Sequence, residues 1–116
     1  MWDIIFYKDS KGNEVIAEFL DSLPIKHRAK VLREIELLSE FGLKLREPHT
    51  KHISGKLWEL RVKFSSDISR VFYFVPMNNT IILLHGFVKK TNETPKSEIN
   101  TAVKRMNDYY KNGSDL

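Results

Sequence analysis

The stretch Leu57–Phe64 reads Leu-Trp-Glu-Leu-Arg-Val-Lys-Phe, and apolar and polar side chains alternate along it. Alternation with a period of two is typical of a strand that has one apolar and one polar face. Residues 70–75 and 80–88 are rich in aromatic and β-branched side chains, and turn-forming residues separate the three stretches at 65–67 and 76–79. The sequence therefore predicts a three-stranded antiparallel meander over residues 57–88.

The alternation also predicts which side chains share a face of this meander, because successive side chains of a strand point to opposite faces. The predicted apolar face consists of Trp58, Leu60, Val62, Val71, Tyr73, Ile82, Leu84 and Val88. The predicted polar face carries Glu59, Arg61, Lys63, Arg70, His85 and Lys89, with Phe72, Phe74, Leu83 and Phe87 among them. A β-bulge would shift this register.

The polar face has an excess of cations, which repel one another across adjacent strands. A phosphate group would relieve that repulsion, because the arginine guanidinium matches phosphate oxygens bidentately. Aromatic side chains between the cations are suited to stack on bases. The alternative is a solvated face on which Glu59 pairs with Arg61 or Lys63.

The segments before the meander predict one further strand and two helices. Residues 2–7 are aromatic and β-branched, which favours a strand. Apolar residues at helical spacing predict a helical hairpin over 14–41, with Pro24 at the first position of the second helix and Gly42 as its C-cap. Residues 43–56 are predicted to form a basic loop.

After the meander, the sequence predicts a last helix with Thr94 as N-cap and Pro95 at its first position. The tail over 112–116 is expected to be frayed. The predicted fold is α+β: one domain over residues 1–116 in the order strand, helix, helix, three-stranded meander, helix, with the helices packed on one face of the sheet.

Composition narrows the functional classes. The 116 residues include no cysteine, which excludes disulfides, thiolate zinc sites and a cysteine nucleophile. No apolar run approaches the roughly 20 residues of a membrane helix, so a cytoplasmic protein without membrane contact is expected. The net charge of +4 is divided unevenly, with −2 over residues 1–43 and +6 over residues 44–116. This asymmetry points to a polyanionic partner for the second part of the chain.

Several motifs together resemble the HigB branch of the RelE/ParE toxin superfamily, whose members are also described as phage-derived toxin-like proteins. In chain order these motifs are Leu57-Trp58-Glu59-Leu60-Arg61, Arg70-Val71-Phe72-Tyr73, residues 83–91, Thr94-Pro95, Glu98-Ile99 and Ala102. The resemblance covers nearly the whole chain and is strongest over 55–105. It implies a RelE-like fold.

The resemblance further implies the toxin of a type II toxin–antitoxin system. Relatives of this kind cleave messenger RNA on the ribosome without a metal or another cofactor, and the ribose 2′-hydroxyl attacks the adjacent phosphate. The expected partners are a helix-turn-helix antitoxin of the HigA type, the ribosome and messenger RNA. Operator DNA would be contacted only through the antitoxin.

The motif positions imply specific site residues. Arg70 and Lys89 are expected to stabilise charge in the transition state, Arg61 to position the phosphate, and His85 to act as an acid or base. The expected RNA-binding residues are Lys56, Lys63, Lys90 and Phe87.

Glu59 departs from the pattern, because efficient relatives often have a base at its position. It is expected to activate the 2′-hydroxyl, to pair with Arg61, or to mark a weaker enzyme. Tyr109 and Tyr110 are candidates for a C-terminal base. His49 and His52 lack the carboxylate-rich surroundings of a metal site.

Two other functions stay open. One is a gyrase inhibitor of the ParE type, which would produce DNA breaks rather than cut messenger RNA. The other is a domain that binds an antitoxin-like protein or RNA without cleavage, which the carboxylate at Glu59 favours.

Overall fold

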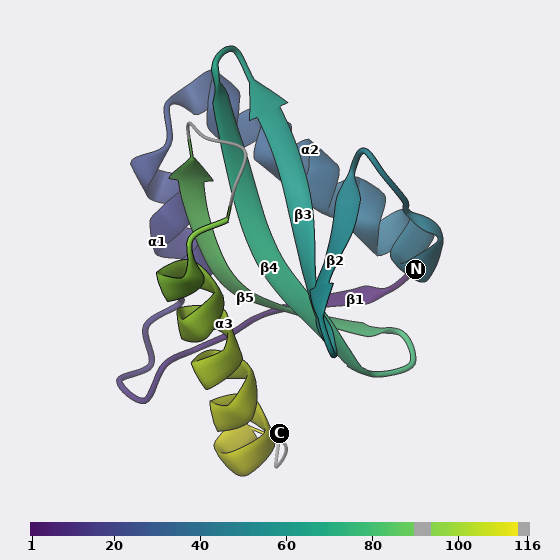
Figure 1. The fold of residues 1–116 in the computed structure, drawn as a ribbon, viewed down its shortest axis with the longest axis vertical. Helices are drawn as coiled ribbons and strands as arrows, with labels where there is room; N and C mark the ends of the chain where they lie inside the picture. The colour runs from purple at the N-terminus through teal and green to yellow at the C-terminus, as the bar shows by residue number, and fades with distance from the viewer. Residues whose placement is uncertain (90–93, 114–116) are drawn as a thin grey trace.

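The computed structural model describes residues 1–89 and 94–113 (Figure 1). The chain order is β1 (Asp3–Phe6), α1 (Val15–Ser22), α2 (Ile25–Phe41), β2 (Thr50–Ser54), β3 (Leu57–Phe64), β4 (Asp67–Met77), β5 (Thr80–Lys89) and α3 (Lys96–Asp108). A short 3-10 turn, Gly42–Lys44, follows α2, and a π-helical turn, Tyr109–Gly113, follows α3. The tail over 112–116 was expected to be frayed. The turn continues to Gly113 and residues 114–116 lie outside the described part, so this stays a prediction.

The sheet differs from the predicted three-stranded meander. It is a mixed sheet of five strands in the order β1-β5-β4-β3-β2. Strands β3, β4 and β5 pair antiparallel in succession, and β1 adds to β5 in parallel. Residues 50–54 were predicted as loop but form the edge strand β2, which pairs antiparallel with β3. The sheet is therefore wider than the meander on both sides.

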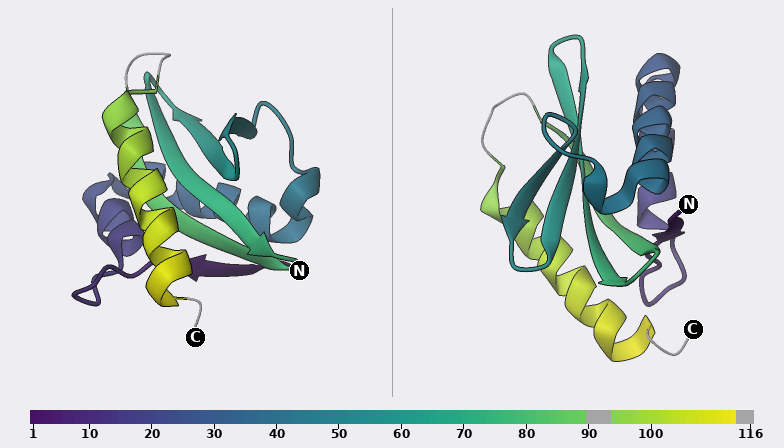
Figure 2. Two further views of the ribbon diagram at one scale, coloured as in Figure 1. Left: turned by 60° about the horizontal axis from the view of Figure 1, so that its bottom comes forward. Right: turned by 90° about the vertical axis from the view of Figure 1, so that its right-hand side faces the viewer.

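The helices cover both faces of the sheet, so the prediction that they pack on one face was wrong. Figure 2 shows α1 and α2 on one side of the strands and α3 on the other, most clearly in its right-hand view. The α1/α2 side encloses one buried cluster, which includes Ile16, Leu38, Leu60, Val71 and Leu83. The α3 side encloses a second cluster, which includes Leu57, Phe72, Phe74, Leu84 and Ala102. The predicted polar face therefore has an apolar core of its own.

A β-bulge in the β4–β5 pair accounts for the errors in the predicted faces. Phe72 pairs with His85, but the next residue, Tyr73, pairs with Leu83. Leu84 is therefore the extra residue, and the side chains of β5 before it change sides. Ile82 and Leu84, predicted for the α1/α2 side, lie under α3, and Leu83 lies on the α1/α2 side. Val88, predicted as core, is 39% exposed.

Local sequence explains where the helices begin and end. Pro24 and Pro95 are the N-cap residues of α2 and α3 rather than their first helical residues, so each helix begins one residue later than predicted. Neither helix has a side-chain N-cap bond. Gly42 ends α2 as predicted, with a φ of 54° that favours glycine, and a side chain there would collide with the Trp2 indole. None of the helices in the described ranges is long and apolar enough to cross a membrane.

Candidate functional site

The polar side chains of β3, β4 and β5 converge at one end of the α3 side of the sheet. Arg61 pairs across the strands with Arg70, and Arg70 pairs with Phe87. Direct cross-strand partners point to the same face. Glu59, Arg61, Arg70 and Lys89 therefore share the face that the alternation predicted for them, because the bulge lies beyond Phe72 and leaves this end of the register unchanged.

Glu59 is the centre of this arrangement. Its Oε1 atom accepts a hydrogen bond from Arg70 Nη1 at 2.7 Å and lies 3.5 Å from Arg61 Nε. Its Oε2 atom accepts a hydrogen bond from Thr94 Oγ1 at 3.0 Å. We call Glu59, Arg61, Arg70 and Thr94 the Glu59 cluster. Of the three roles considered for Glu59, the geometry supports ion pairing, and its shorter ion pair is with Arg70 rather than with Arg61.

The cations of this face differ strongly in exposure. Arg70 is 1% exposed and Lys89 is 7% exposed, whereas the Arg61 side chain is 29% exposed. Lys63 lies two residues beyond Arg61 on the same face of β3 and is exposed. Its carbonyl oxygen accepts a hydrogen bond from Lys30 on α2. Arg70 and Lys89, expected to touch the reacting phosphate, are therefore covered, and Arg61 is the arginine of the cluster that reaches the surface.

His85 has both ring nitrogens engaged by α3. Nδ1 lies 3.0 Å from Arg105 Nη1, and Nε2 lies 3.1 Å from Glu98 Oε1. A guanidinium only donates, so Nδ1 accepts and the ring proton is on Nε2, which donates to Glu98. Burial lowers the pKa of His85 from its ordinary 6.5; Glu98 opposes this shift and Arg105 adds to it. Both ring nitrogens of His85 are therefore engaged by α3, and its expected role as an acid or base stays a prediction.

Phe87 is buried rather than displayed for stacking. Its exposure is 9%, and its ring centroid lies 5.5 Å from that of Phe72 and 5.7 Å from that of His85. The three rings form the end of the core under α3. The Phe87 ring is therefore covered in this structure, and stacking of Phe87 on an RNA base stays a prediction.

The remaining predicted residues lie elsewhere. Lys56, in the turn between β2 and β3, contacts Tyr110: its Nζ atom is 3.2 Å from the hydroxyl and 5.2 Å from the ring centroid. Tyr109 and Tyr110 pack on Phe74. Tyr109 and Tyr110 follow α3, so the length of that helix, about 20 Å at 1.5 Å per residue, separates them from Thr94. They are not part of the Glu59 cluster, and Lys90 lies outside the described residues.

The other histidines have local partners. His49 Nδ1 lies 2.7 Å from Glu34 Oε1, His52 Nε2 lies 2.7 Å from the Gly55 carbonyl oxygen, and His27 Nε2 lies 2.5 Å from Ser69 Oγ. Within residues 1–89 and 94–113, no group of three or more His, Asp or Glu side chains has the arrangement of a metal site.

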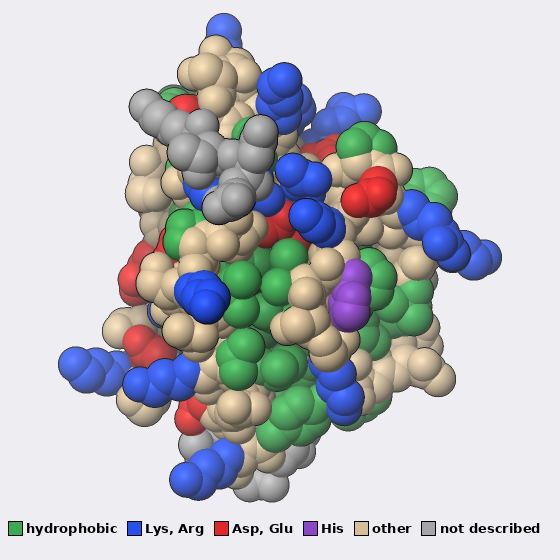
Figure 3. All heavy atoms as spheres, in the orientation of Figure 1, with side chains coloured by type: hydrophobic (Ala, Val, Ile, Leu, Met, Phe, Trp, Pro, Cys, Tyr) green, Lys and Arg blue, Asp and Glu red, His purple; other side chains and the backbone are tan. Residues whose placement is uncertain are grey.

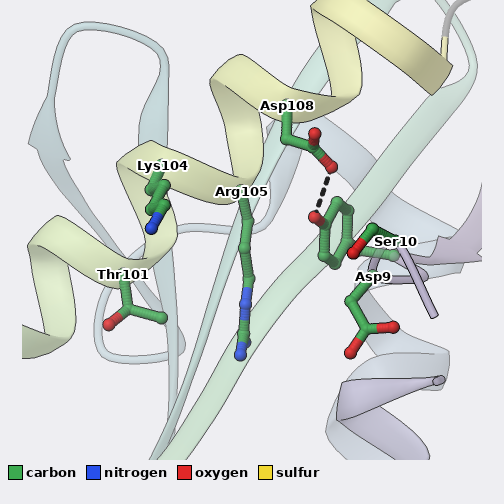
Figure 4. Close-up of a pocket in the computed structure, with 7 residues that line it drawn as sticks. Asp9, Ser10, Thr101, Lys104, Arg105 and Asp108 are labelled. Atoms are coloured by element: carbon green, nitrogen blue, oxygen red, sulfur yellow. Dashed lines mark hydrogen bonds between the residues drawn. The ribbon is translucent and has the colours of Figure 1, made fainter.

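A separate pocket of about 380 Å³ lies between α3 and the loop after β1 (Figure 4). Tyr7, Asp9, Ser10, Thr101, Lys104, Arg105 and Asp108 line it. The Tyr7 hydroxyl donates to Asp108 Oδ2 at 2.5 Å, and burial together with Asp108 raises the pKa of Tyr7 to about 12. The carboxylates balance the cations here, so the pocket lacks the positive excess of the Glu59 cluster.

Figure 3 shows the α3 side of the surface, where Lys and Arg side chains surround a partly exposed apolar area. The partly buried apolar residues of this side are Ile53, Ile99, Val103 and Met106, with Val15 and Tyr109. On this face, positive side chains therefore border an apolar surface.

Sequence reasoning missed three residues of this site: Thr94, Glu98 and Arg105. Thr94 was interpreted as a helix cap, but its hydroxyl binds Glu59 instead. Glu98 and Arg105 are seven residues apart and so lie on one face of α3. That spacing, with an acid and a base on the face that carries the apolar stripe, is the signal that would have found them.

Comparison with known families assigns the chain. A search of the curated proteins found no match. The family described as phage-derived protein Gp49-like (DUF891) matches residues 18–107, which include α2, all of β2 to β5 and the whole Glu59 cluster. The match covers well over half of the 116 residues. The chain therefore belongs to the family of phage-derived Gp49-like proteins.

Proposed function

We propose that this protein is the toxin of a type II toxin–antitoxin system and that it cuts messenger RNA on the ribosome. The Gp49-like family is associated with RelE and toxin-like proteins, which supports a toxin-like role. The observation that carries the proposal is the cross-strand pairing of Arg61 with Arg70 around a buried carboxylate, with Lys89 on the same face. This grouping concentrates positive charge at a partly exposed site.

The proposed reaction is an internal transfer within the RNA. The ribose 2′-oxygen attacks the adjacent phosphorus, and the bond from phosphorus to the 5′-oxygen breaks. The 2′-hydroxyl loses its proton and the 5′-oxygen gains one, which leaves a 2′,3′-cyclic phosphate and a free 5′-hydroxyl. Negative charge accumulates on the phosphoryl oxygens in the transition state, and fixed cations stabilise it.

Exposure decides the roles of the three cations. Arg61, whose side chain is 29% exposed, contacts the phosphate. Arg70 and Lys89, at 1% and 7% exposure, act from beneath the surface through their positive potential. Lys63 is exposed on the same strand and binds a neighbouring phosphate of the RNA backbone.

The proposed partners follow from the same family resemblance. A helix-turn-helix antitoxin of the HigA type neutralises the toxin, and operator DNA is bound through that antitoxin. The ribosome presents the messenger RNA. A positive surface is suited to this setting, because ribosomal RNA and messenger RNA are both polyanions.

The test is to incubate the purified protein with ribosomes on a defined messenger RNA and to map new 5′ ends. Wild-type protein should produce discrete ends that carry a 5′-hydroxyl. Arg61→Gln should reduce cleavage about 10²–10³-fold, as does the loss of one preorganised donor in other enzymes. Arg33→Gln is the matched control, because Arg33 is exposed on α2, on the other side of the sheet. Intact messenger RNA with wild-type protein would reject the proposal.

A second function, binding without cleavage, is favoured by one observation. Glu59 and His85, the acid–base candidates of this face, have their polar atoms engaged by Arg70, Thr94, Glu98 and Arg105. A protein that binds RNA or an antitoxin-like partner does not need a proton acceptor. Uncut messenger RNA together with tight binding to ribosomes would support this second function.

A further inference from the structure

The carboxylate of Glu59 is fully buried and has partners on both oxygens. The residue is 0% exposed, and Oε1 and Oε2 have different partners: the two arginines on one side and Thr94 on the other. A carboxylate that takes a proton from a substrate hydroxyl needs an accessible oxygen. Glu59 acts on the site through the side chains that it binds.

Stability alone does not account for a buried ion pair at this position. Removing two charges from water is costly, and well-packed apolar residues often replace such a pair with no loss of stability. The surrounding core of Phe72, Phe74 and Leu57 is apolar and would accommodate such a replacement. The pair therefore points to a requirement for charge at this position.

The two arginines need a carboxylate to stay together. Arg61 and Arg70 are direct cross-strand partners, and like charges opposite each other on a sheet repel. Glu59 Oε1 lies within 4 Å of a guanidinium nitrogen of each, so one oxygen bridges the pair. The exposed arginine is thereby tied to the buried one and has less rotational freedom to lose when it binds an anion.

Thr94 fixes the other end of the carboxylate. It precedes α3, while Glu59 lies within β3, so their hydrogen bond joins the start of the last helix to the middle of the sheet. A hydrogen bond on Oε2 restricts rotation of the carboxylate about its terminal bond. The orientation of Oε1 toward the arginines therefore depends on the Thr94 hydroxyl.

We infer that Glu59 is a positioning residue that holds Arg61 and Arg70 in register for the phosphate, and that Thr94 sets the orientation of its carboxylate. The inference names a function for the departure at position 59, and it rests on the proposed function for its kinetic consequence. Of the roles left open for Glu59, pairing with arginine then becomes part of the preorganised site.

The test compares three threonine substitutions in the full-length protein. Thr94→Val removes the hydrogen bond to Glu59 and keeps the side-chain shape, whereas Thr94→Ser keeps the hydroxyl. Thr101→Val is the matched control, because the Thr101 hydroxyl donates to the Ser97 carbonyl oxygen on α3 and does not contact the Glu59 cluster. Glu59→Gln, which removes the charge, is a further variant but is at risk of unfolding because it leaves Arg70 buried without its carboxylate.

Two measurements decide the inference. The first is the split between kcat and KM for messenger RNA cleavage on ribosomes: Thr94→Val should lower kcat about tenfold with little change in KM, and Thr94→Ser should restore it. The second is the ¹⁵N NMR signal of the arginine Nε–H groups. The Arg61 and Arg70 signals should shift and broaden in Thr94→Val and should match wild type in Thr101→Val.

The outcomes separate this inference from the proposed function. If the wild-type protein cuts no messenger RNA, the proposed function fails, and the NMR signals alone still decide whether Thr94 and Glu59 order the arginines. If Thr94→Val lowers only the melting temperature, with kcat and both arginine signals unchanged, Glu59 has a purely structural role and the inference is wrong.

Discussion

The two faces of the sheet bury different kinds of side chains. The side under α1 and α2 has a cluster of twelve buried residues, all apolar or aromatic. The side under α3 has a smaller apolar cluster, and next to it Glu59, Arg70 and Lys89 are also buried. The first face also buries Thr50 and the hydrogen-bonded pair His27–Ser69. The second face instead buries a carboxylate and two cations, charges that folding alone does not require. The contrast between the faces locates the candidate site.

The largest expected effect is the loss of stability when Arg70 is removed from the α3 face. Arg70→Ala leaves the Glu59 carboxylate buried without its main partner, so the free energy of unfolding should fall by about 3–5 kcal/mol. The double variant Glu59→Leu/Arg70→Met should recover most of that loss, because apolar residues of similar volume replace the pair. Urea denaturation of both variants measures the difference. A loss below about 1 kcal/mol in Arg70→Ala, the value typical of an exposed pair, would contradict the burial argument.

A comparable loss of stability on the α1/α2 face should leave messenger RNA cleavage unchanged. Leu38 is 0% exposed on α2, and Leu38→Ala should lower the free energy of unfolding by about 2–5 kcal/mol. Because Leu38 lies across the sheet from the Glu59 cluster, cleavage per folded molecule should stay at the wild-type value. Ile25→Ala is the control, since Ile25 is 79% exposed on the same helix and should change stability by less than about 0.5 kcal/mol. A specific loss of kcat in Leu38→Ala would show that the two faces are coupled.

The smallest expected effect is a pH dependence of stability that arises from His85 on the α3 face. Burial lowers the pKa of His85 below its ordinary 6.5, so the folded protein takes up this proton at a lower pH than the unfolded chain. The unfolded state then binds more protons as the pH falls below 6.5, and stability decreases until the pKa of the folded state is passed. The expected slope from this group is at most about 1.4 kcal/mol per pH unit.

His85→Gln removes this titration. The difference between wild type and His85→Gln in the free energy of unfolding should therefore shrink from pH 7 toward pH 5, which urea titrations at several pH values can follow. Parallel curves for the two proteins would mean that α3 docks independently of the protonation of His85.

For the strands whose side chains alternate, the positions were predicted correctly. The face of the sheet to which their side chains point was predicted correctly only in part. Along β3 the alternation is clean, so the grouping of Glu59 with Arg61 and Arg70 followed from spacing. Along β5 it failed, because Leu84 is an extra residue in the register with β4 and reverses the facing of the side chains before it. Gly86, near this bulge, also packs closely against α1, and a side chain there would collide with the Phe19 ring.

Neither the edge strand β2 nor the burial of the polar face could be predicted from the pattern of charges. Residues 50–54 contain Lys51 and His52 and do not alternate, so only their hydrogen bonding to β3 makes them a strand. The polar face was interpreted from its cations, although Phe72, Phe74 and Phe87 lie among them. Those rings and the apolar stripe of α3 cover each other, which explains why two of the expected contact residues, Arg70 and Phe87, are buried.

The parallel pairing of β1 with β5 has a consequence for the order in which the chain is made. Asp3 to Phe6 lie beside Thr80 to Leu83, so β1 finds its neighbouring strand only after residues 80–83 have been translated and have left the ribosome. Until then, Ile4 and Phe6, which pack against the α1/α2 core, lack the strand beside which they are held. Every residue of the Glu59 cluster is also synthesised after residue 58. Completion of the sheet therefore waits for β5, and completion of the Glu59 cluster waits for Thr94.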